Sequence, residues 1–290
     1  MSFVSPKLLL RRLGLKPRKS WGQHFLLYPH QARRIVAALA LTGQELVVEI
    51  GPGLGALTVF LAPAAAHVVA LEVDPLLTHY LQEELFPAPA KVQVLCQDVL
   101  EFDFLKLRRE AGQPLVVVGN LPYQITSPLL FKLIAAQEAL SRAVFMVQAE
   151  VGARLTSPPG SKDYGGLTVL AQYYFSVRSL FSLGPANFYP APQVASVVLS
   201  LAPARPSPPA ADEDLLRRVV KAAFAARRKT LKNNLAAQAA AFGLPPGGMG
   251  AALAAAAIDP KRRGETLSLA EFVALSNAIG ARARPDREGI

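Results

Sequence analysis

Cysteine and long apolar runs are scarce in this chain, and each scarcity excludes a class of protein. Cys96 is the only cysteine among 290 residues, so the chain can form no internal disulfide and no cysteine-rich zinc site. The four histidines, at positions 24, 30, 67 and 79, show no metal-ligand spacing with acids or with Cys96. We therefore expect no metal.

No apolar run reaches the roughly 18 residues that a membrane-spanning helix needs, so no membrane partner is expected. The Leu8–Leu10 run is too short for a signal peptide, and Arg11 and Arg12 follow it at once. A reducing cytoplasm is the expected location.

Acidic residues are missing from the first 44 positions, which carry eight Lys and Arg. The net charge of +10 is uneven, because residues 45–211 carry a net −3 and residues 212–290 a net +5. A faintly acidic middle between basic flanks suits a cationic cofactor at the centre and a polyanion held from both sides. An arginine-rich surface without functional meaning is the alternative.

Short β-rich runs alternate with helical stretches, and several are continuous Val, Leu and Ile, as in parallel strands buried on both faces. The alternation predicts an α/β fold with an open, doubly wound sheet. The last two strands lie close together without a full helix between them, which allows a terminal antiparallel hairpin. The predicted strands are Leu46–Ile50, His67–Leu71, Lys91–Leu95, Leu115–Val118, Ala143–Val147, Gln172–Val177 and Ala195–Leu201.

The segment A-P-A-R-P-S-P-P-A-A at 202–211 can continue neither a strand nor a helix. Asp212 behind it can cap a helix. We expect an α/β domain over residues 1–204, a linker over 205–211 and a small all-helical domain over 212–290.

The motif E-I-G-P-G-L-G at 49–55 predicts a strand-to-helix turn that holds a nucleoside cofactor. Gly51 and Gly53 allow a sharp turn and close backbone approach to a ligand. Glu72 ends the second strand, where a carboxylate can chelate ribose hydroxyls. The string also fits the dinucleotide pattern G-x-G-x-x-G/A, which leaves an NAD(P)-dependent dehydrogenase open.

Two further acids bear on that choice. Asp98 ends the third strand and can accept from an adenine amine, with Val99 against the ring. Glu49 precedes the turn, where an acid disfavours a pyrophosphate and favours a ligand that carries ammonium and sulfonium groups. The three acids in register favour a cofactor site over solvated strand-end charges.

The motif N-L-P-Y at 120–123 is suited to an exocyclic amine on a flat ring. Asn120, through its side-chain oxygen, and the Leu121 carbonyl can accept both N–H bonds and so localise the lone pair of an adenine amine. Pro122 stiffens the loop, and Tyr123 offers a face on which an extruded base can stack. A structural Asn-Pro turn with a buried tyrosine is the alternative.

Cations cluster after residue 212. On one continuous helix, Arg217, Lys221, Arg228 and Lys232 would share a narrow arc without acids, which favours phosphate contact over an ordinary solvated face. The expected RNA-binding residues are Arg217, Lys221, Arg227, Arg228, Lys229 and Lys232. A second basic patch, with a mitochondrial transit segment as the rival explanation, comprises Arg11, Arg12, Lys16, Arg18 and Lys19.

These motifs resemble the ribosomal RNA adenine dimethyltransferases over nearly the whole chain. G-Q-H-F-L at 22–26, L-E-V-D at 71–74, Q-D-V at 97–99 and F-Y-P-A-P-Q-V-A-S at 188–196 resemble successive family motifs, besides the two already quoted. Q-A-E-V-G-A-R-L at 148–155 and Y-G-G-L-T-V-L at 164–170 resemble later ones. F-A-A-R-R-K-T-L-K-N-N-L at 224–235 and R-G-E-T-L-S-L-A-E-F at 263–272 resemble the C-terminal domain of the bacterial small-subunit enzymes, which argues against a resistance methylase.

The resemblance implies a class I, Rossmann-like fold and S-adenosyl-L-methionine as cofactor. It also implies dimethylation of N6 on two adjacent adenosines in a hairpin near the 3′ end of 16S rRNA, during small-subunit assembly, by a protein that we expect to be a monomer. A non-catalytic assembly or transcription factor on the same fold is the rival.

The family's site residues carry over to matching positions here. Phe188 corresponds to an aromatic near the target base. Two positions depart from the usual pattern: His24 stands where asparagine is usual, and Trp21 where phenylalanine is usual. The implied cofactor contacts are His24, Leu26, Gly51, Glu72, Asp98 and Asn120.

Overall fold

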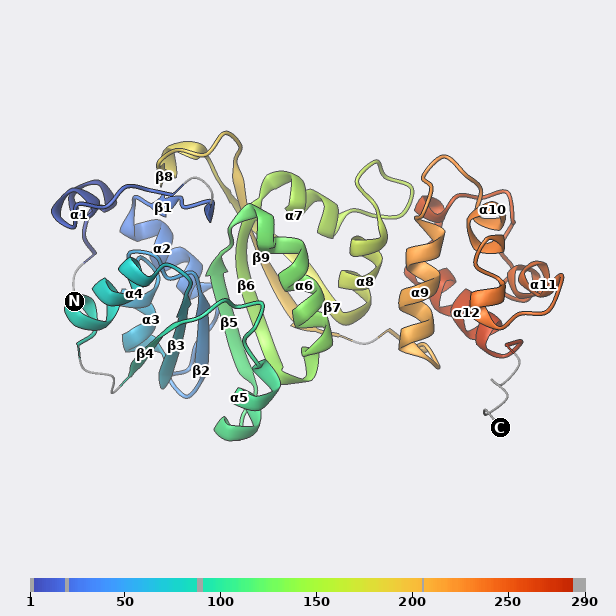
Figure 1. Cartoon of the computed structure of the whole chain (residues 1–290), viewed down its shortest axis with the longest axis horizontal. Coiled ribbons are helices and arrows are strands. Elements are labelled where there is room, and N and C mark those ends of the chain that lie inside the picture. Colours follow the sequence, from blue (N-terminus) through green and yellow to red (C-terminus); the bar gives the residue numbers. More distant parts are fainter. Residues whose placement is uncertain (1–2, 19–20, 88–90, 205, 284–290) are drawn as a thin grey trace. The chain divides into compact units, whose positions relative to one another are not determined.

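The computed structural model describes residues 3–18, 21–87, 91–204 and 206–283, with the side chain of Tyr123 outside the description. The chain divides into two compact units (Figure 1). The first comprises Met1–Gly152 and Ser176–Pro203, and the second Ala153–Phe175 and Ala204–Ile290. The second unit includes residues before the proline-rich segment, because α8 (Gly166–Tyr174) packs on α9 (Glu213–Ala223).

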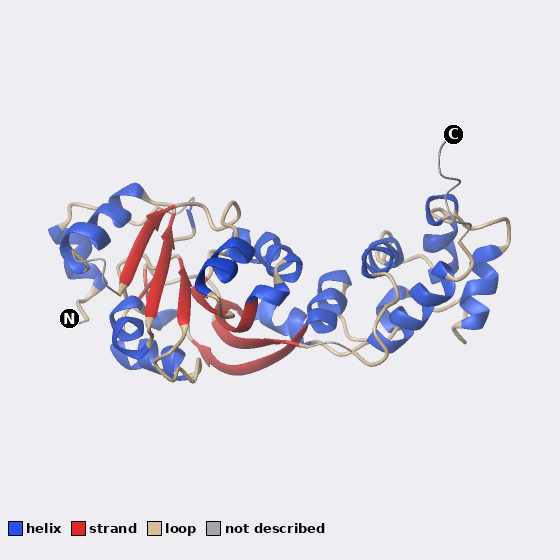
Figure 2. Ribbon diagram, turned by 90° about the horizontal axis from the view of Figure 1, so that it is seen from below, coloured by secondary structure: helices blue, strands red, loops and turns tan. Residues whose placement is uncertain are grey.

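A seven-stranded sheet forms the centre of the first unit, with helices on both faces (Figure 2). Its order is β4-β3-β2-β5-β6-β9-β7. The five neighbouring strands from β4 through β3, β2 and β5 to β6 are parallel, and β9 pairs with β6 antiparallel. The strands are β2 (Leu46–Ile50), β3 (His67–Glu72), β4 (Val92–Cys96), β5 (Leu115–Asn120), β6 (Leu140–Gln148), β7 (Phe175–Leu183) and β9 (Ser196–Pro203). The predicted α/β, doubly wound fold with a terminal antiparallel strand is confirmed.

The strand predicted over Gln172–Val177 is wrong at its start. Residues 172–174 complete α8, and β7 begins at Phe175. The Gln172 side-chain amide donates to the carbonyls of Leu155 and Ser157, which fixes this last helical turn by contacts outside the local sequence. A two-stranded sheet of β1 (Phe25–Leu26) and β8 (Phe188–Tyr189) was not predicted, because two-residue strands carry no alternation.

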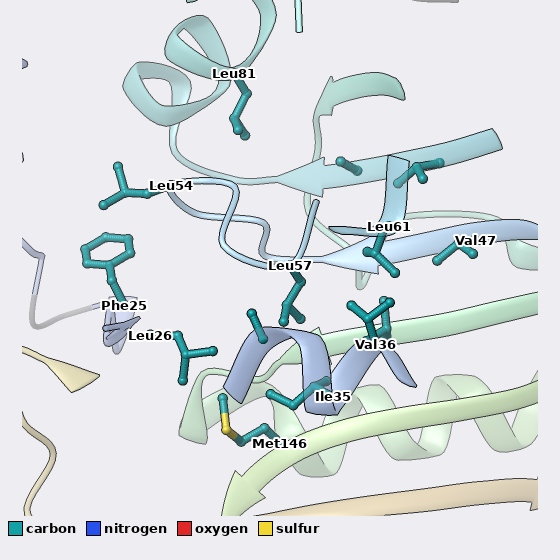
Figure 3. Packing of buried hydrophobic residues seen from close by; sticks show 14 of the residues in the cluster. Phe25, Leu26, Ile35, Val36, Val47, Leu54, Leu57, Leu61, Leu81 and Met146 are labelled. Atoms are coloured by element: carbon teal, nitrogen blue, oxygen red, sulfur yellow. The ribbon is translucent and has the colours of Figure 1, made fainter. Parts of the chain in front are cut away.

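One hydrophobic cluster packs helices α1 to α4 of the first unit against strands of the sheet. Figure 3 shows Leu26, Leu54, Leu57 and Met146 among its members, close to the carboxyl end of β2. The same cluster therefore supports the surface on which a ligand would lie. The helices of the first unit, together with α7, which runs into the second, are α1 (Pro6–Arg12), α2 (Pro29–Ala37), α3 (Thr58–Ala64), α4 (Pro75–Tyr80, continued by a π turn over Leu81–Leu85), α5 (Phe104–Ala111), α6 (Thr126–Ala135) and α7 (Ala149–Thr156).

The second unit is helical. Besides α8 and α9 it contains α10 (Leu231–Ala236), α11 (Gly248–Ala255) and α12 (Leu269–Gly280). Short 3₁₀ turns in the two units cover Tyr123–Ile125, Gln137–Ala139, Pro185–Asn187, Ala240–Phe242 and Gly264–Thr266. Within the described ranges, none of the helices is long and apolar enough to cross a membrane.

The single helix expected to carry Arg217 through Lys232 is wrong. Helix α9 ends at Ala223, and α10 begins only at Leu231. The buried side chain of Asn234 donates to the carbonyls of Ala223 (2.9 Å) and Ala226 (3.0 Å), which would otherwise continue the helical ladder. The cations at 227–229 consequently lie on a loop rather than on a helical arc.

Candidate active site

A cavity of about 300 Å³ opens at the carboxyl ends of β2, β3, β4 and β5. This is the edge where ligands bind in open parallel sheets. Its walls contain the glycine loop after β2, the acids after β3 and β4, and the loop after β5. The predicted site residues in its lining are His24, Leu26, Glu49, Gly51, Gly53, Glu72, Asp98, Val99, Asn120 and Pro122.

The glycine loop needs its glycines for two reasons. Gly51 and Gly53 have backbone φ angles of +64° and +59°, which residues other than glycine rarely adopt. A Cβ on Gly53 would lie 3.1 Å from the Phe25 ring. The loop thus leaves bare backbone along the cavity wall.

Glu72 is held rigidly at the cavity edge. Its carboxylate accepts from the backbone N–H groups of Gly53 (2.9 Å), Val73 (3.0 Å) and Asp74 (3.0 Å). Burial raises the pKa of Glu72, and these N–H groups offset part of that rise. Glu72 therefore ties the glycine loop to the turn after β3.

Glu49 is the most unusual group in the cavity. Its side chain is 1% exposed, and Oε2 has no hydrogen-bond partner among the described residues. Burial raises its pKa to about 8, the charge of Glu72 adds to the rise, and contact with Thr58 offsets part of it. A buried carboxyl group with one oxygen left without a hydrogen-bond partner in a ligand cavity is suited to a cationic ligand.

The segment that follows β4 brings Asp98 and Val99, the residues predicted to contact an adenine, to the cavity wall. Asp98 accepts from the Leu100 N–H at 2.8 Å, which holds its carboxylate at the cavity wall. Val99 is buried and lines the cavity beside it.

Residues 21–26 line the cavity, and together with Arg18, which contacts Asp74, they are called the strap. Because the Pro190 carbonyl only accepts, His24 Nδ1, 2.7 Å away, donates to it. Leu26 pairs with Phe188 in the β1–β8 sheet. Trp21 and Gln23 also line the cavity. The sequence did not single out Gln23. The available signal was its position as a polar residue inside the motif G-Q-H-F-L at 22–26.

The loop after β5 places Asn120 and Pro122, two of the residues predicted to act on the target amine, in the cavity wall. The Asn120 amide donates to the His24 carbonyl at 2.9 Å, which turns its oxygen away from that bond and toward other donors. The Leu121 N–H donates to Met146 O at 3.0 Å, and the Leu121 side chain is buried. Pro122 lines the cavity, whereas the side chain of Tyr123 lies outside the described residues.

Phe188 is not at the cavity surface. It is 3% exposed and belongs to the hydrophobic cluster, where it supports Leu26 across the β1–β8 pair. The structure thus gives Phe188 a packing position, and it is not among the lining residues.

The residues present fit S-adenosylmethionine. The orphaned Glu49 carboxylate suits a ligand with sulfonium and ammonium groups, and the bare backbone at Gly53 suits close approach. Within the described ranges, no group of three or more acids, histidines or cysteines could hold a metal ion.

The predicted RNA-binding cations of the second unit fall into two kinds. Arg217 pairs with Glu213 and Asp214 of its own first turn, and Arg227 pairs with Glu265 at 3.0 Å. The expectation of an acid-free arc is therefore wrong for Arg217. No ion pair is found within the described ranges for the exposed residues Lys221, Arg228, Lys229 and Lys232.

A family model described as ribosomal RNA adenine dimethylase matches residues 14–275. A protein named ribosomal RNA small subunit methyltransferase A from Geobacter sulfurreducens is 44% identical over 272 residues, which cover 93% of this chain and 98% of the relative. The protein of the same name from Myxococcus xanthus is 42% identical over 278 residues, or 95% of each.

Two solved structures share the fold. A dimethyladenosine transferase from Plasmodium falciparum has a TM-score of 0.73 at 24% identity, over 87% of this chain and 96% of that one. The 23S rRNA methyltransferase ErmE has a TM-score of 0.66 at 24% identity, over 88% and 99%.

Proposed function

Because the chain belongs to the ribosomal RNA adenine dimethylase family, we propose that it methylates N6 of two adjacent adenosines in a hairpin near the 3′ end of 16S rRNA, with S-adenosylmethionine as donor. The assembling small ribosomal subunit is the proposed partner, and the cytoplasm the proposed location. The observation that carries the proposal is the position of Asn120 in the same cavity as Glu49, Glu72 and Asp98.

In the proposed mechanism, Asn120 raises the nucleophilicity of the target amine. The adenine lone pair is delocalised into the ring. When the Asn120 oxygen and the Leu121 carbonyl accept the two N–H bonds, the nitrogen can pyramidalise and the lone pair localises on it. Because Asn120 is already fixed through its amide to His24 O, little reorganisation is needed as the amine attacks.

S-adenosylmethionine supplies the electrophilic methyl group when it is bound. Glu72 is positioned for the ribose hydroxyls, Asp98 and Val99 for the adenine, and Glu49 for the cationic end of the ligand. Pro122 keeps the loop stiff, and Tyr123 is proposed to stack on the target base. As the amine nitrogen takes the methyl group, the C–S bond of the donor breaks and S-adenosylhomocysteine is left. The nitrogen is then positively charged and acidic enough to lose its proton to water, so no general base is required.

RNA docking is assigned to the unpaired cations. Lys221, Arg228, Lys229 and Lys232 are exposed without acidic partners in the described part of the chain, so they can contact phosphates without first breaking an ion pair. Arg217 and Arg227 would have to leave their carboxylates, and we propose only a secondary role for them.

Methyl transfer in vitro tests the proposal. With labelled S-adenosylmethionine, the protein should methylate small subunits isolated from cells that lack the modification. Methylation of free 23S rRNA alone would contradict it. Titration of NADH as a competitor checks the dehydrogenase alternative, because a dinucleotide needs room for a pyrophosphate beside Glu49.

A further inference from the structure

We propose that Asp74 is a positioning residue for the cofactor and acts as the latch that holds the strap across the cavity. The proposal rests on the proposed cofactor role of the cavity. Asp74 follows β3 and is 4% exposed. It was not among the residues that the sequence suggested for the site.

Both carboxylate oxygens of Asp74 contact the strap. Oδ2 accepts from Gln23 Nε2 at 3.1 Å, and Oδ1 lies 3.5 Å from Arg18 Nη1. Gln23 closes the network, because its Oε1 accepts from the Arg18 N–H at 2.9 Å. The Arg18 guanidinium also lies over the Trp21 ring, 4.4 Å from its centroid. One buried carboxylate thereby organises the start of the strap.

The other end of the strap is anchored on the opposite side of the site. The side-chain amide of Asn120, the last residue of β5, donates to His24 O. Phe25 and Leu26, which follow His24, pair with β8. In the sheet, β2 lies between β3 and β5. The strap therefore crosses the carboxyl end of β2, where the glycine loop begins, from Asp74 on one side to Asn120 on the other.

The two anchors differ in how easily they can open. At the Asn120 end, Phe25 and Leu26 are buried in the core and paired in a sheet. At the Asp74 end, the contacts found between Asp74 and the described strap residues are made by side chains, and Arg18 is 40% exposed. The Asp74 end is therefore the one that releases when a ligand enters or leaves.

Asp74 is also coupled to the proposed ribose contact. Its backbone N–H donates to Glu72 Oε1 at 3.0 Å, while Gly53 N–H donates to Glu72 Oε2. A ligand that orders Glu72 steadies the same turn that carries the latch. Closure of the strap and occupation of the ribose site should consequently reinforce each other.

A test must separate the latch from a second task of Asp74. Oδ1 also accepts from Leu76 N at 3.1 Å and caps α4. Asp74→Ser keeps a capping oxygen but is too short to reach Gln23. Gln23→Met removes the latch contact from the other partner and leaves the cap intact. Asp103→Ser is the matched control, because Asp103 caps α5 in the same way and contacts Lys106 N.

The readout is the dissociation rate of S-adenosylmethionine. Trp21 is the only tryptophan in the chain and lies in the strap, so its fluorescence can follow release during displacement by excess S-adenosylhomocysteine. Asp74→Ser and Gln23→Met should each raise the rate about ten-fold or more, as expected for losing a charge-assisted hydrogen bond. The double variant should be little faster than either single one, because both break one latch. Asp103→Ser should leave the rate unchanged.

Unchanged dissociation from Asp74→Ser and Gln23→Met would overturn the latch, as would fully additive effects in the double variant. A wild-type protein that binds no S-adenosylmethionine in calorimetry would instead contradict the proposed function. Thermal unfolding of each variant identifies any loss that comes from the fold rather than from the strap.

Discussion

Glu49 gives the site a pH dependence whose sign can be derived. Its pKa is about 8 in the folded protein and 4.5 ordinarily, so between these values the folded state holds a proton that the unfolded state has released. The free energy of unfolding should therefore fall as pH rises from about 5 to 8, by up to about 1.4 kcal/mol per unit. Glu49→Gln should be more stable relative to the wild type at pH 8 than at pH 6.

Urea unfolding of the wild type and Glu49→Gln at both pH values checks this. The difference between the two proteins cancels the titration of groups that do not interact with Glu49. A stability difference that does not change with pH would contradict the raised pKa. A cationic ligand should favour the ionised carboxylate, so affinity for S-adenosylmethionine should rise with pH in the wild type and less in Glu49→Gln.

Asn120 is the residue to which we assign the chemical step. Asn120→Ala should lower the turnover number far more than RNA affinity, because its bonds to the amine strengthen in the transition state. The substitution also removes the bond to His24 O, so affinity for S-adenosylmethionine must be measured beside kcat. Equal losses in cofactor affinity and turnover would assign Asn120 to the strap alone.

Among the individual residues, most of those that the sequence predicted for the site line the cavity, whereas the tertiary contacts that hold them were not predicted. Glycines after a strand and acids at strand ends are local signals, and Gly51, Gly53, Glu72 and Asp98 line the cavity. The contacts of Asp74 with Gln23 span 51 residues, and no local pattern encodes them. The burial of Phe188 was likewise not predicted, because the motif that suggests a base contact carries no signal for its packing in the core.

Among the elements, the break between α9 and α10 has the clearest consequence. Asn234 holds the loop that carries Arg228 and Lys229 through its bonds to Ala223 and Ala226. Asn234→Ala should destabilise the second unit by about 1–3 kcal/mol, since it leaves backbone carbonyls without partners. It should also weaken small-subunit binding. Asn233→Ala, on the exposed neighbour, is the control, and an equal effect of both variants on stability would contradict the role of Asn234.

The elements also show where periodicity succeeds and fails. Strands β2 to β6 contain apolar runs, continuous in β5 and broken by Gln93 in β4, and the sequence predicts them within a few residues. The end of α9 depends on a side chain eleven residues later in the chain, so a helical arc drawn through 232 could not anticipate it. The start of β7 depends likewise on Gln172 contacts with residues 155 and 157.

For the whole molecule, the charge distribution predicts how RNA binding responds to salt. Arg228→Glu with Lys232→Glu should weaken small-subunit binding strongly at low salt and less at high salt. Each lost phosphate contact should lower the slope of log affinity against log salt by about 0.7–0.9. The division into an α/β domain and a helical RNA-docking domain remains a proposal, and this pair of substitutions should leave cofactor affinity intact.

A second charge reversal of equal size controls for net charge. Lys106→Glu with Arg109→Glu changes exposed residues of α5 in the first unit. It should change the salt slope little. An equal loss from both double variants would mean that total charge alone drives binding. An unchanged salt slope for Arg228→Glu with Lys232→Glu would instead move the docking role to the N-terminal basic patch.

The central claim is that this chain dimethylates two adjacent adenosines near the 3′ end of 16S rRNA. Mass spectrometry of 16S rRNA from cells that have only the wild-type protein, only Asn120→Ala, or neither tests it most directly. We predict two adjacent dimethylated adenosines with the wild type and their loss in both other cases. Full dimethylation of 16S rRNA in cells without the protein would contradict the account.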